Sequence, residues 1–359
     1  MTDAMVGADG MSFGSCLIGR AHRPFVIAEM SGNHNQSLDR ALAIVEAAAD
    51  AGAHGLKLQT YTPDTMTLDV DRDDFLITGK DNPWTGRRLH ELYREAMTPW
   101  EWHEPLFKRA RDLGMIPLST PFDDTAVELL EDLDAAVYKI ASFESNHLPL
   151  LRRVAATGKP VIMSTGMATL GELDLAVRTL RGAGCRDIVL LKCTSTYPAT
   201  PENTNILTIP HMRELFGCEV GLSDHTHGIG VAVASVALGA TVIEKHFTLR
   251  RADGGVDSTF SMEPEEMKAL VTETERAWQA LGHVSYGPTA AEQGSRAFRR
   301  SLYVVRDCPP GHALSADDLR IVRPGHGLEP VAWDDVIGLT LPRGARRGDA
   351  VTFDLFRTS

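Results

Sequence analysis

The sequence predicts an α/β protein in which a (β/α)8 TIM barrel is followed by a small β-rich domain. Eight short apolar runs rich in strand-forming residues recur before residue 283, and each is followed by a segment with helical periodicity. A barrel of this kind uses about 250 residues. A chain of 359 residues therefore has room for one barrel and one further small domain.

The predicted strands are, in chain order, PFVIAEM, HGLKLQT, GMIPLST, AVYKIAS, PVIMST, DIVLLKC, EVGLS and TVIEKHF. The helix predicted after the first strand begins with Ser37 as its N-cap and ends with Gly52 as its C-cap. Its apolar face comprises Leu38, Leu42, Val45 and Ala49. Strands follow one another at intervals of about 20 to 30 residues, as repeated strand–helix units require.

One interval is longer, because roughly 55 residues separate the second and third strands. This insertion, from Tyr61 to Phe107, carries three of the five tryptophans and two of the six tyrosines. We expect it to fold over the barrel mouth. It is either a surface elaboration with its own aromatic cluster or a lid over a substrate.

The regular apolar periodicity of the sequence ends after Gly282. We predict a barrel domain at residues 1–282, a linker at 283–297, and a compact domain of short strands and turns at 298–359. The last domain is too small to bury much surface alone, so we expect it to dock on another surface.

Composition narrows the classes of function. A net charge of −12 argues against a nucleic acid or an anionic membrane held by a broad basic surface. The start of the chain lacks the features of a secretion signal, and no run approaches the ~20 apolar residues of a membrane span. The five cysteines are never spaced as CxxC, which favours a reducing compartment. We therefore expect a cytoplasmic protein.

Polar residues end the predicted strands, where a barrel places its chemistry. They are Glu29, Lys57, Gln59, Ser119, Thr120, Lys139, Ser142, Glu144, Ser164, Thr165, Lys192, Thr194, Ser195, Ser223, Asp224, His225, Glu244, Lys245 and His246. Few of these residues suit an apolar core.

Lysines are the most informative of these residues. They occupy corresponding positions on the even-numbered strands: Lys57, Lys139, Lys192 and Lys245. We expect each to place an ammonium group near the mouth. Four such charges require either the neighbouring glutamates or a bound phosphate and carboxylate as a partner. The nearby hydroxyl groups of Ser142, Ser164 and Ser223 favour a bound phosphate.

His225 and His246 end the two adjacent strands seven and eight. They are either hydrogen-bonded structural residues or two ligands of a metal such as Mn²⁺, Fe²⁺ or Zn²⁺. Two protein ligands leave positions for water and a substrate oxygen, which is typical of a catalytic site. Spacing alone leaves both interpretations open.

Seven motifs in order resemble the sialic acid synthase family: AEMSGNHNQS, KLQTYTPDTM, YKIASFE, STGMA, CTSTYPA, GLSDHT and IEKHFTL. Residues 298–359, with RRSLYV and RPGHGL, resemble the antifreeze-like (SAF) domain that follows the barrel in this family. The resemblance covers nearly the whole chain. Within the family, AEMSGNHNQSLDRA, MTPWEWHEPLF and FTLRRADGGVDSTFS are most similar to the pseudaminic acid synthase branch.

The resemblance implies an enzyme, a transferase that forms a carbon–carbon bond. It would condense phosphoenolpyruvate with 2,4-diacetamido-2,4,6-trideoxy-β-L-altropyranose and water, giving pseudaminic acid and phosphate. It implies a divalent metal, Mn²⁺ or Mg²⁺, at His225 and His246. It also implies a domain-swapped homodimer in which Arg323 reaches the sugar from the partner subunit.

The resemblance assigns the remaining roles as follows. The residues implied for phosphoenolpyruvate are Lys57, Thr120, Lys139, Ser142, Ser164 and Ser223. Those implied for the sugar are Gln59, Glu144, Tyr197, Asp257 and Arg323. From the chemistry that these residues allow, our catalytic candidates are Glu29, Lys57, Lys139 and Glu144, with Glu29 as the general base for water.

Two departures from the family pattern favour a sugar other than N-acetylmannosamine. Ser195 stands where sialic acid synthases tend to have asparagine, and AEMSGNHNQS replaces AEIGxNHxG. N-acetylneuraminate and legionaminate synthases remain alternatives within the family. Outside it, the alternatives are a Schiff-base aldolase, a metal-dependent hydrolase and a carbohydrate-binding protein.

Overall fold

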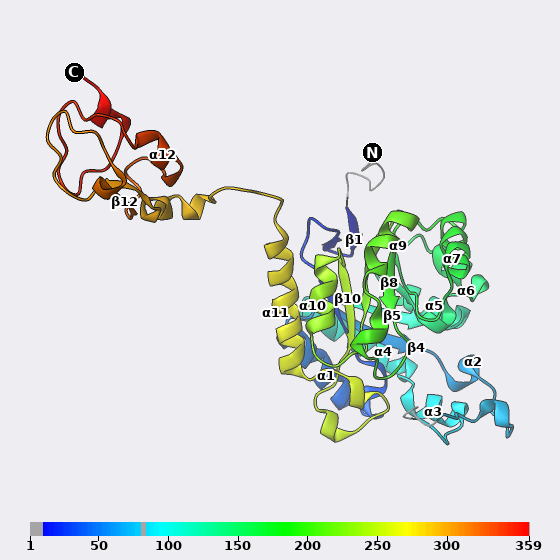
Figure 1. Ribbon diagram of the computed structural model, residues 1–359. Helices are drawn as coiled ribbons and strands as arrows, with labels where there is room; N and C mark the ends of the chain where they lie inside the picture. Colours follow the sequence, from blue (N-terminus) through cyan, green and yellow to red (C-terminus); the bar gives the residue numbers. More distant parts are fainter. Residues whose placement is uncertain (1–9, 80–83, 359) are drawn as a thin grey trace. The chain divides into compact units, whose positions relative to one another are not determined.

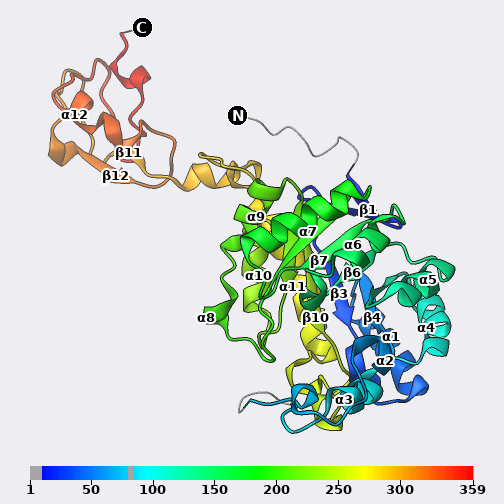
Figure 2. The ribbon, with the colours of Figure 1, turned by 90° about the vertical axis from the view of Figure 1, so that its right-hand side faces the viewer.

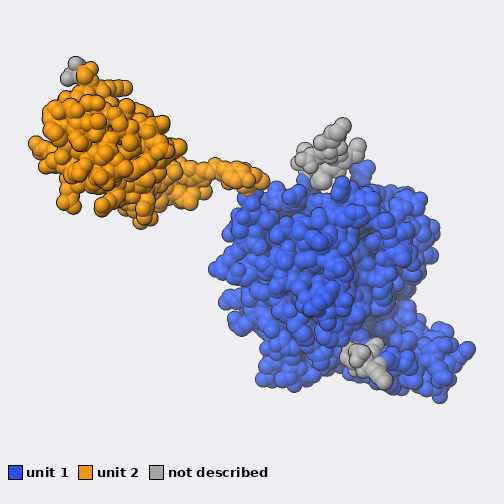
Figure 3. Space-filling view, in the orientation of Figure 1, with its two compact units in different colours: residues 1–282 blue, residues 283–359 orange. Residues whose placement is uncertain are grey.

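The computed structural model describes residues 10–79 and 84–358 (Figure 1). The chain divides into two compact units, unit 1 at residues 1–282 and unit 2 at residues 283–359 (Figure 3). Among the described residues, no helix combines the length and apolar character needed to cross a membrane.

Unit 1 is a closed barrel of eight parallel strands, in which the last strand pairs with the first (Figure 2). This confirms the predicted TIM barrel. The strands are β3 (Phe25–Glu29), β4 (Gly55–Thr60), β5 (Ile116–Pro121), β6 (Tyr138–Ile140), β7 (Val161–Ser164), β8 (Ile188–Cys193), β9 (Glu219–Ser223) and β10 (Val242–His246).

Helices surround the barrel, and their apolar faces pack on the outer faces of the strands. They are α1 (Leu38–Asp50), α4 (Trp100–Asp112), α5 (Asp124–Asp132), α6 (Leu148–Ala155), α7 (Leu170–Gly182), α9 (Thr208–Phe216), α10 (Gly230–Ala237) and α11 (Pro264–Leu281). The short helix α8 (Pro201–Thr204) follows β8.

Helix α1 shows how far the sequence pattern holds. Ser37 is the N-cap as predicted, because its hydroxyl accepts a hydrogen bond from the Arg40 amide (3.3 Å). The C-cap prediction was wrong by one residue, since Ala51 caps the helix and Gly52 follows with φ +85°. The predicted apolar face lies at the margin of the buried one. Of the predicted face only Val45 is fully buried, and the other fully buried residues of α1 are Ala41, Ile44 and Ala48.

Alternation along the strands decides which residues line the barrel interior. An inner apolar cluster fills the barrel and includes Phe25, Ile27, Leu118, Val137, Ile162, Val189, Leu191 and Val242. Residues an even number of positions further along each strand face inward too. The interior near the carboxyl ends is therefore lined by Glu29, Lys57, Thr120, Lys139, Ser164, Cys193, Ser223, Glu244 and His246.

The same alternation corrects the prediction that four lysines face the mouth. Only Lys57 and Lys139 point inward. Lys192 has the outward parity, and its ammonium donates to the Cys193 carbonyl (2.8 Å) and to Thr194 Oγ1 (3.4 Å). Lys245 also points outward, where it pairs with Asp224 (2.8 Å). A shift of one residue along a strand moves a side chain to the opposite face of the sheet. Residue type alone therefore could not distinguish the inward lysines, Lys57 and Lys139, from the outward ones, Lys192 and Lys245.

The two ends of the barrel are covered differently. A hairpin of β1 (Met11–Phe13) and β2 (Cys16–Ile18) lies at one end, and α2 (Pro63–Met66) with α3 (Leu89–Ala96) lies at the other (Figures 1 and 2). Phe13 and Ile18 join the inner apolar cluster, so the hairpin closes the end at which the strands begin. The insertion between β4 and β5, which includes α2 and α3, lies at the end where they finish.

Unit 2 contains one antiparallel pair, β11 (Ser301–Val304) and β12 (Leu319–Val322), the short helix α12 (Trp333–Val336) and several isolated bridges. It has an apolar core of its own, formed by Leu302, Val304, Cys308, Leu314, Leu319, Val336, Leu341, Ala345 and Val351. Its strands are short, and turns make up most of the unit.

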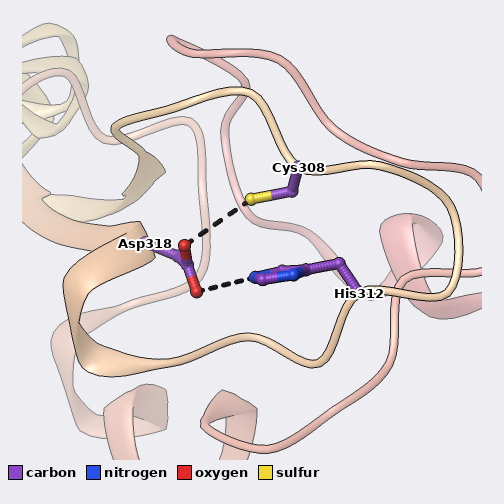
Figure 4. A group of neighbouring side chains, drawn as sticks. All are labelled: Cys308, His312 and Asp318. Atoms are coloured by element: carbon purple, nitrogen blue, oxygen red, sulfur yellow. Dashed lines mark hydrogen bonds and ion pairs between the residues drawn. The ribbon is translucent and has the colours of Figure 1, made fainter.

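Asp318 organises the loop before β12 (Figure 4). Its fully buried carboxylate accepts hydrogen bonds from Arg306, from the amide and hydroxyl of Ser315 (both 2.7 Å), and from His312 (3.0 Å). Asp318, Cys308 and His312 could each offer one atom to a metal ion, and these atoms lie within 4.8 Å of one another. Among the described residues, this is the one group of three His, Cys, Asp or Glu side chains that meets this distance. Both carboxylate oxygens are already satisfied by protein donors, so we interpret the cluster as a structural anchor.

Replacing Phe13 by alanine should lower the free energy of unfolding by about 3–5 kcal/mol, because it leaves a cavity between the hairpin and the inner layer. Urea denaturation followed by circular dichroism measures the change. Leu17 lies on the same hairpin but is 52% exposed, so Leu17→Ala should change stability by no more than about 0.5 kcal/mol. Equal losses in the two variants would contradict this placement of the hairpin.

Candidate active site

Four charged side chains meet inside the barrel near the carboxyl ends of the strands. Lys57 forms an ion pair with Glu29, and its Nζ lies 3.9 Å from Glu244 Oε1. Lys139 Nζ lies 3.8 Å from the same Glu244 oxygen. All four side chains are buried. We call this group the charged cluster; Glu244 is its central member.

Hydroxyl and amide groups surround the charged cluster. Lys139 donates to Ser164 Oγ (2.7 Å), and Lys57 donates to Thr120 Oγ1 (3.4 Å). Ser223 Oγ donates to Glu244 Oε1 (3.2 Å), and Gln59 Nε2 donates to Glu29 Oε1 (3.0 Å). The structure therefore brings together predicted residues of strands β3, β4, β5, β6, β7, β9 and β10.

The two glutamates of the charged cluster have different acidities. Burial raises the pKa of Glu29 to about 7, even though Lys57 opposes the shift. Burial also raises the pKa of Glu244, but the ammonium groups of Lys139 and Lys57 outweigh it and hold this pKa below its usual value. Glu244 is thus a permanent anion near neutral pH, whereas Glu29 is suited to exchange a proton.

Three buried carboxylate oxygens have no hydrogen-bond donor among the described residues, Oε2 of Glu29, of Glu144 and of Glu244. That of Glu29 takes part in the ion pair with Lys57, which leaves those of Glu144 and Glu244. Glu144 lies in the 3-10 turn Ser142–Glu144 after β6, and burial raises its pKa to about 7. Orphaned polar atoms are rare in folded proteins and point to a group that binds there. They mark this end of the barrel as a ligand site.

Ser142, which follows β6, lies close to Gly166, which follows β7. Its Oγ accepts a hydrogen bond from the Gly166 amide (3.1 Å). A Cβ at Gly166 would lie 2.7 Å from Ser142 Oγ and 2.1 Å from Ser195 Oγ. Only glycine fits at this position, so the STGMA motif keeps the two serines close to the site.

The two histidines also come together. The ring centroids of His225 and His246 are 5.3 Å apart. Nδ1 of His225 lies 3.0 Å from the Thr194 carbonyl oxygen, which fixes the ring and leaves Nε2 free of that contact. Nδ1 of His246 is buried and has no partner among the described residues. Burial lowers the pKa of His246 well below its usual value and keeps this imidazole neutral, the form that binds a metal.

An aromatic wall encloses the histidine pair, formed by Tyr197, Phe260 and Trp84. The Tyr197 ring centroid lies 4.5 Å from that of His225 and 5.2 Å from that of Phe260. Trp84, from the insertion, lies 5.7 Å from Tyr197 between ring centroids, and its indole donates to the Val256 carbonyl (2.9 Å). The insertion therefore reaches the barrel mouth.

Asp257 is connected to the charged cluster through Ser31 and Gln59. Its buried carboxylate accepts a hydrogen bond from Ser31, whose Oγ also accepts from Gln59 Nε2 (3.1 Å). Burial raises the pKa of Asp257. A continuous polar path thus runs from Asp257 through Gln59 to Glu29.

One predicted site residue lies in the other unit. Arg323 is an exposed residue of unit 2, where it borders a hollow together with Arg299 and Arg300. Its predicted contact with the sugar stays a prediction.

Four further residues of the site, Phe260, Trp84, Ser31 and Cys193, are not among the predicted site residues. Cys193 takes the inward position on β8 that the prediction assigns to Lys192, and strand parity is the signal that identifies it. Phe260 and Trp84 lie outside the barrel strands, so strand patterning gave no indication of them.

Comparison with known proteins agrees with this geometry. Residues 44–286 match the NeuB family and residues 299–357 match the SAF domain. A pseudaminic acid synthase of Campylobacter jejuni is 42% identical and covers 91% of this chain and 95% of its own. An N,N'-diacetyllegionaminic acid synthase of the same species is 34% identical and covers 88% of this chain and 95% of its own.

Solved structures give the same result. An N-acetylneuraminic acid synthetase from Leptospira borgpetersenii has a TM-score of 0.71 and 31% identity, covering 79% of this chain and 94% of its own. The resemblance predicted from the motifs is confirmed, and because the family match spans more than half of the sequence, this chain belongs to the NeuB family.

Proposed function

We propose that this chain condenses phosphoenolpyruvate with 2,4-diacetamido-2,4,6-trideoxy-β-L-altropyranose and water, giving pseudaminic acid and phosphate. The observation that carries the proposal is the charged cluster inside the barrel, with two histidines at the same end. Higher identity to a pseudaminic acid synthase than to a legionaminic acid synthase supports this choice of sugar.

Phosphoenolpyruvate is held by the two inward lysines and the hydroxyl groups beside them. Lys57 and Lys139 neutralise its phosphate and carboxylate, and each now pairs with buried glutamates that an anionic ligand would partly replace. The hydroxyl groups that complete this subsite are those of Thr120, Ser142, Ser164 and Ser223. Ammonium and hydroxyl groups that are held in place before binding stabilise charge that develops during the reaction.

His225 and His246 suit a divalent metal, because one imidazole nitrogen is orphaned and the other ring is fixed by a carbonyl. We propose Mn²⁺ or Mg²⁺ there. Such an ion, when bound, supplies Lewis-acid polarisation of the sugar aldehyde. Two protein ligands leave coordination positions for water and substrate.

Glu29 acts as the general base. C3 of phosphoenolpyruvate attacks the aldehyde carbon of the open-chain sugar, and positive charge develops at C2. Water adds to C2 while Glu29 takes its proton, and the resulting hemiketal phosphate loses phosphate by cleavage of the C–O bond. The raised pKa of Glu29, about 7, matches this task at neutral pH. Lys57, paired with Glu29, stays charged throughout.

The sugar occupies the space beside the histidines. Gln59, Glu144, Tyr197 and Asp257 bind its hydroxyl and amide groups in this proposal, and Arg323 completes the site from the partner of a domain-swapped homodimer. The aromatic wall supports a 6-deoxy sugar with two acetamido groups, because three methyl groups then meet aromatic rings. Glu144 has a raised pKa of about 7 and can donate a proton to the sugar oxygen.

Phosphate release from phosphoenolpyruvate, measured with a panel of sugars, tests the proposed function. The altrose sugar with Mn²⁺ should give turnover, and EDTA should abolish it because the histidine pair then holds no Lewis acid. The legionaminic-type sugar and N-acetylmannosamine should give little release. Preference for either of those sugars would move the assignment to another branch. No release from any sugar would refute the synthase activity.

Replacing Glu29 by glutamine should lower kcat by about 10²–10⁴-fold while phosphoenolpyruvate still binds, since the amide cannot accept the proton of water. In the native chain, kcat/KM should fall below pH about 7, where Glu29 becomes protonated, and fall again above it, where Glu144, the proposed proton donor, loses its proton. Glu144→Gln should lower kcat and remove the alkaline limb but keep the acidic one, whereas Glu29→Gln should lose the acidic limb. Full activity of Glu29→Gln would remove Glu29 from the mechanism.

A further inference from the structure

Lys245 and Asp224 form an ion pair buried between the barrel and its outer layer. Lys245 Nζ lies 2.8 Å from Asp224 Oδ2, and the side chains are 1% and 0% exposed. Lys245 has the parity of Ile243, which belongs to the outer apolar cluster, so it points away from the barrel interior. The family chemistry proposed above makes no use of this pair.

The ion pair satisfies nearly all its hydrogen-bonding groups within one short loop. The Lys245 ammonium donates to Asp224, to the Thr226 carbonyl (2.6 Å) and to the Gly228 carbonyl (3.0 Å). The other Asp224 oxygen accepts from the Thr226 amide (2.9 Å) and hydroxyl (2.8 Å). The loop 224–228, which follows β9, is therefore wrapped around a single ammonium group.

Both members of the pair are sequence neighbours of the histidines. His225 lies between Asp224 and Thr226, so the contacts of the loop with Lys245 set the backbone from which its imidazole projects. Lys245 precedes His246, and alternation turns the two side chains to opposite faces of β10. Lys245 thus links the end of β10 to the loop that follows β9, at the level of the two histidines.

Stability alone is a poor explanation for this pair. Desolvating two charges costs several kcal/mol per ion, and an apolar pair of similar volume is often equally stable. An ammonium with three directional acceptors, in contrast, admits only one arrangement of the loop. Groups that hold metal ligands in place typically contribute 10–100-fold to metal affinity.

We propose that Asp224 and Lys245 are a positioning pair that holds the imidazoles of His225 and His246 at the separation needed to share one divalent metal. The inference rests on the proposed function, since it requires a metal at these histidines. The pair touches neither the metal nor the substrates and acts through the loop 224–228.

The test is the dissociation constant of Mn²⁺ alone, measured on the full chain from the electron paramagnetic resonance signal of the free ion. The double variant Asp224→Asn/Lys245→Met removes both charges and leaves neither unpaired. We expect it to fold and to bind Mn²⁺ about 10–100-fold more weakly. Thr226→Val, a milder change that removes one hydrogen bond to Asp224, should weaken binding about 2- to 10-fold.

The matched control is the ion pair between Arg213 and Glu219, at the opposite end of β9, with contacts of 2.9 and 2.8 Å. Arg213→Met/Glu219→Gln should bind Mn²⁺ as the native chain does, even where its thermal stability falls. An unchanged dissociation constant in folded Asp224→Asn/Lys245→Met, or in Thr226→Val, would overturn the positioning role. Equal binding by the native chain and by His225→Ala/His246→Ala would instead refute the metal site itself.

Discussion

Two ammonium groups and two carboxylates are buried inside the barrel. None of them would be stable there alone, because an isolated buried charge is very costly. Glu244 lies between Lys57 and Lys139, at 3.9 and 3.8 Å, and Glu29 pairs with Lys57. This mutual neutralisation allows two ammonium groups to be buried before their anionic ligand arrives. Hydrogen bonds to the cluster also orient its neighbours Thr120, Ser164, Ser223 and Gln59.

The arrangement also separates the tasks of the two glutamates. Glu244 keeps its negative charge and compensates the charges of the lysines, whereas Glu29 has a pKa of about 7, close to neutral pH. A ligand with its own negative charges would strengthen this division, because it competes with Glu29 for Lys57. One fixed anion and one exchangeable proton are what a condensation followed by hydration requires.

Much of the fold follows from the sequence, because strand and helix periodicity are local properties. All eight barrel strands and the cap of α1 by Ser37 lie where the pattern placed them. The direction of a side chain is harder to predict, since it depends on register. Lys192 and Lys245 have the same residue type as Lys57 and Lys139, yet they face outward. Trp84 and Phe260 come from connecting segments whose paths depend on tertiary packing.

The direct test of the account compares an inward lysine with an outward one, by isothermal titration of phosphoenolpyruvate. Lys139→Gln should weaken binding about 10- to 100-fold, because a charge-assisted contact to the ligand is lost. Lys192→Gln should bind within about twofold of the native chain, since its ammonium donates to Cys193 and Thr194 instead. Equal losses in both variants, or no loss in Lys139→Gln, would contradict the claim that the inward-facing lysines of the barrel hold phosphoenolpyruvate.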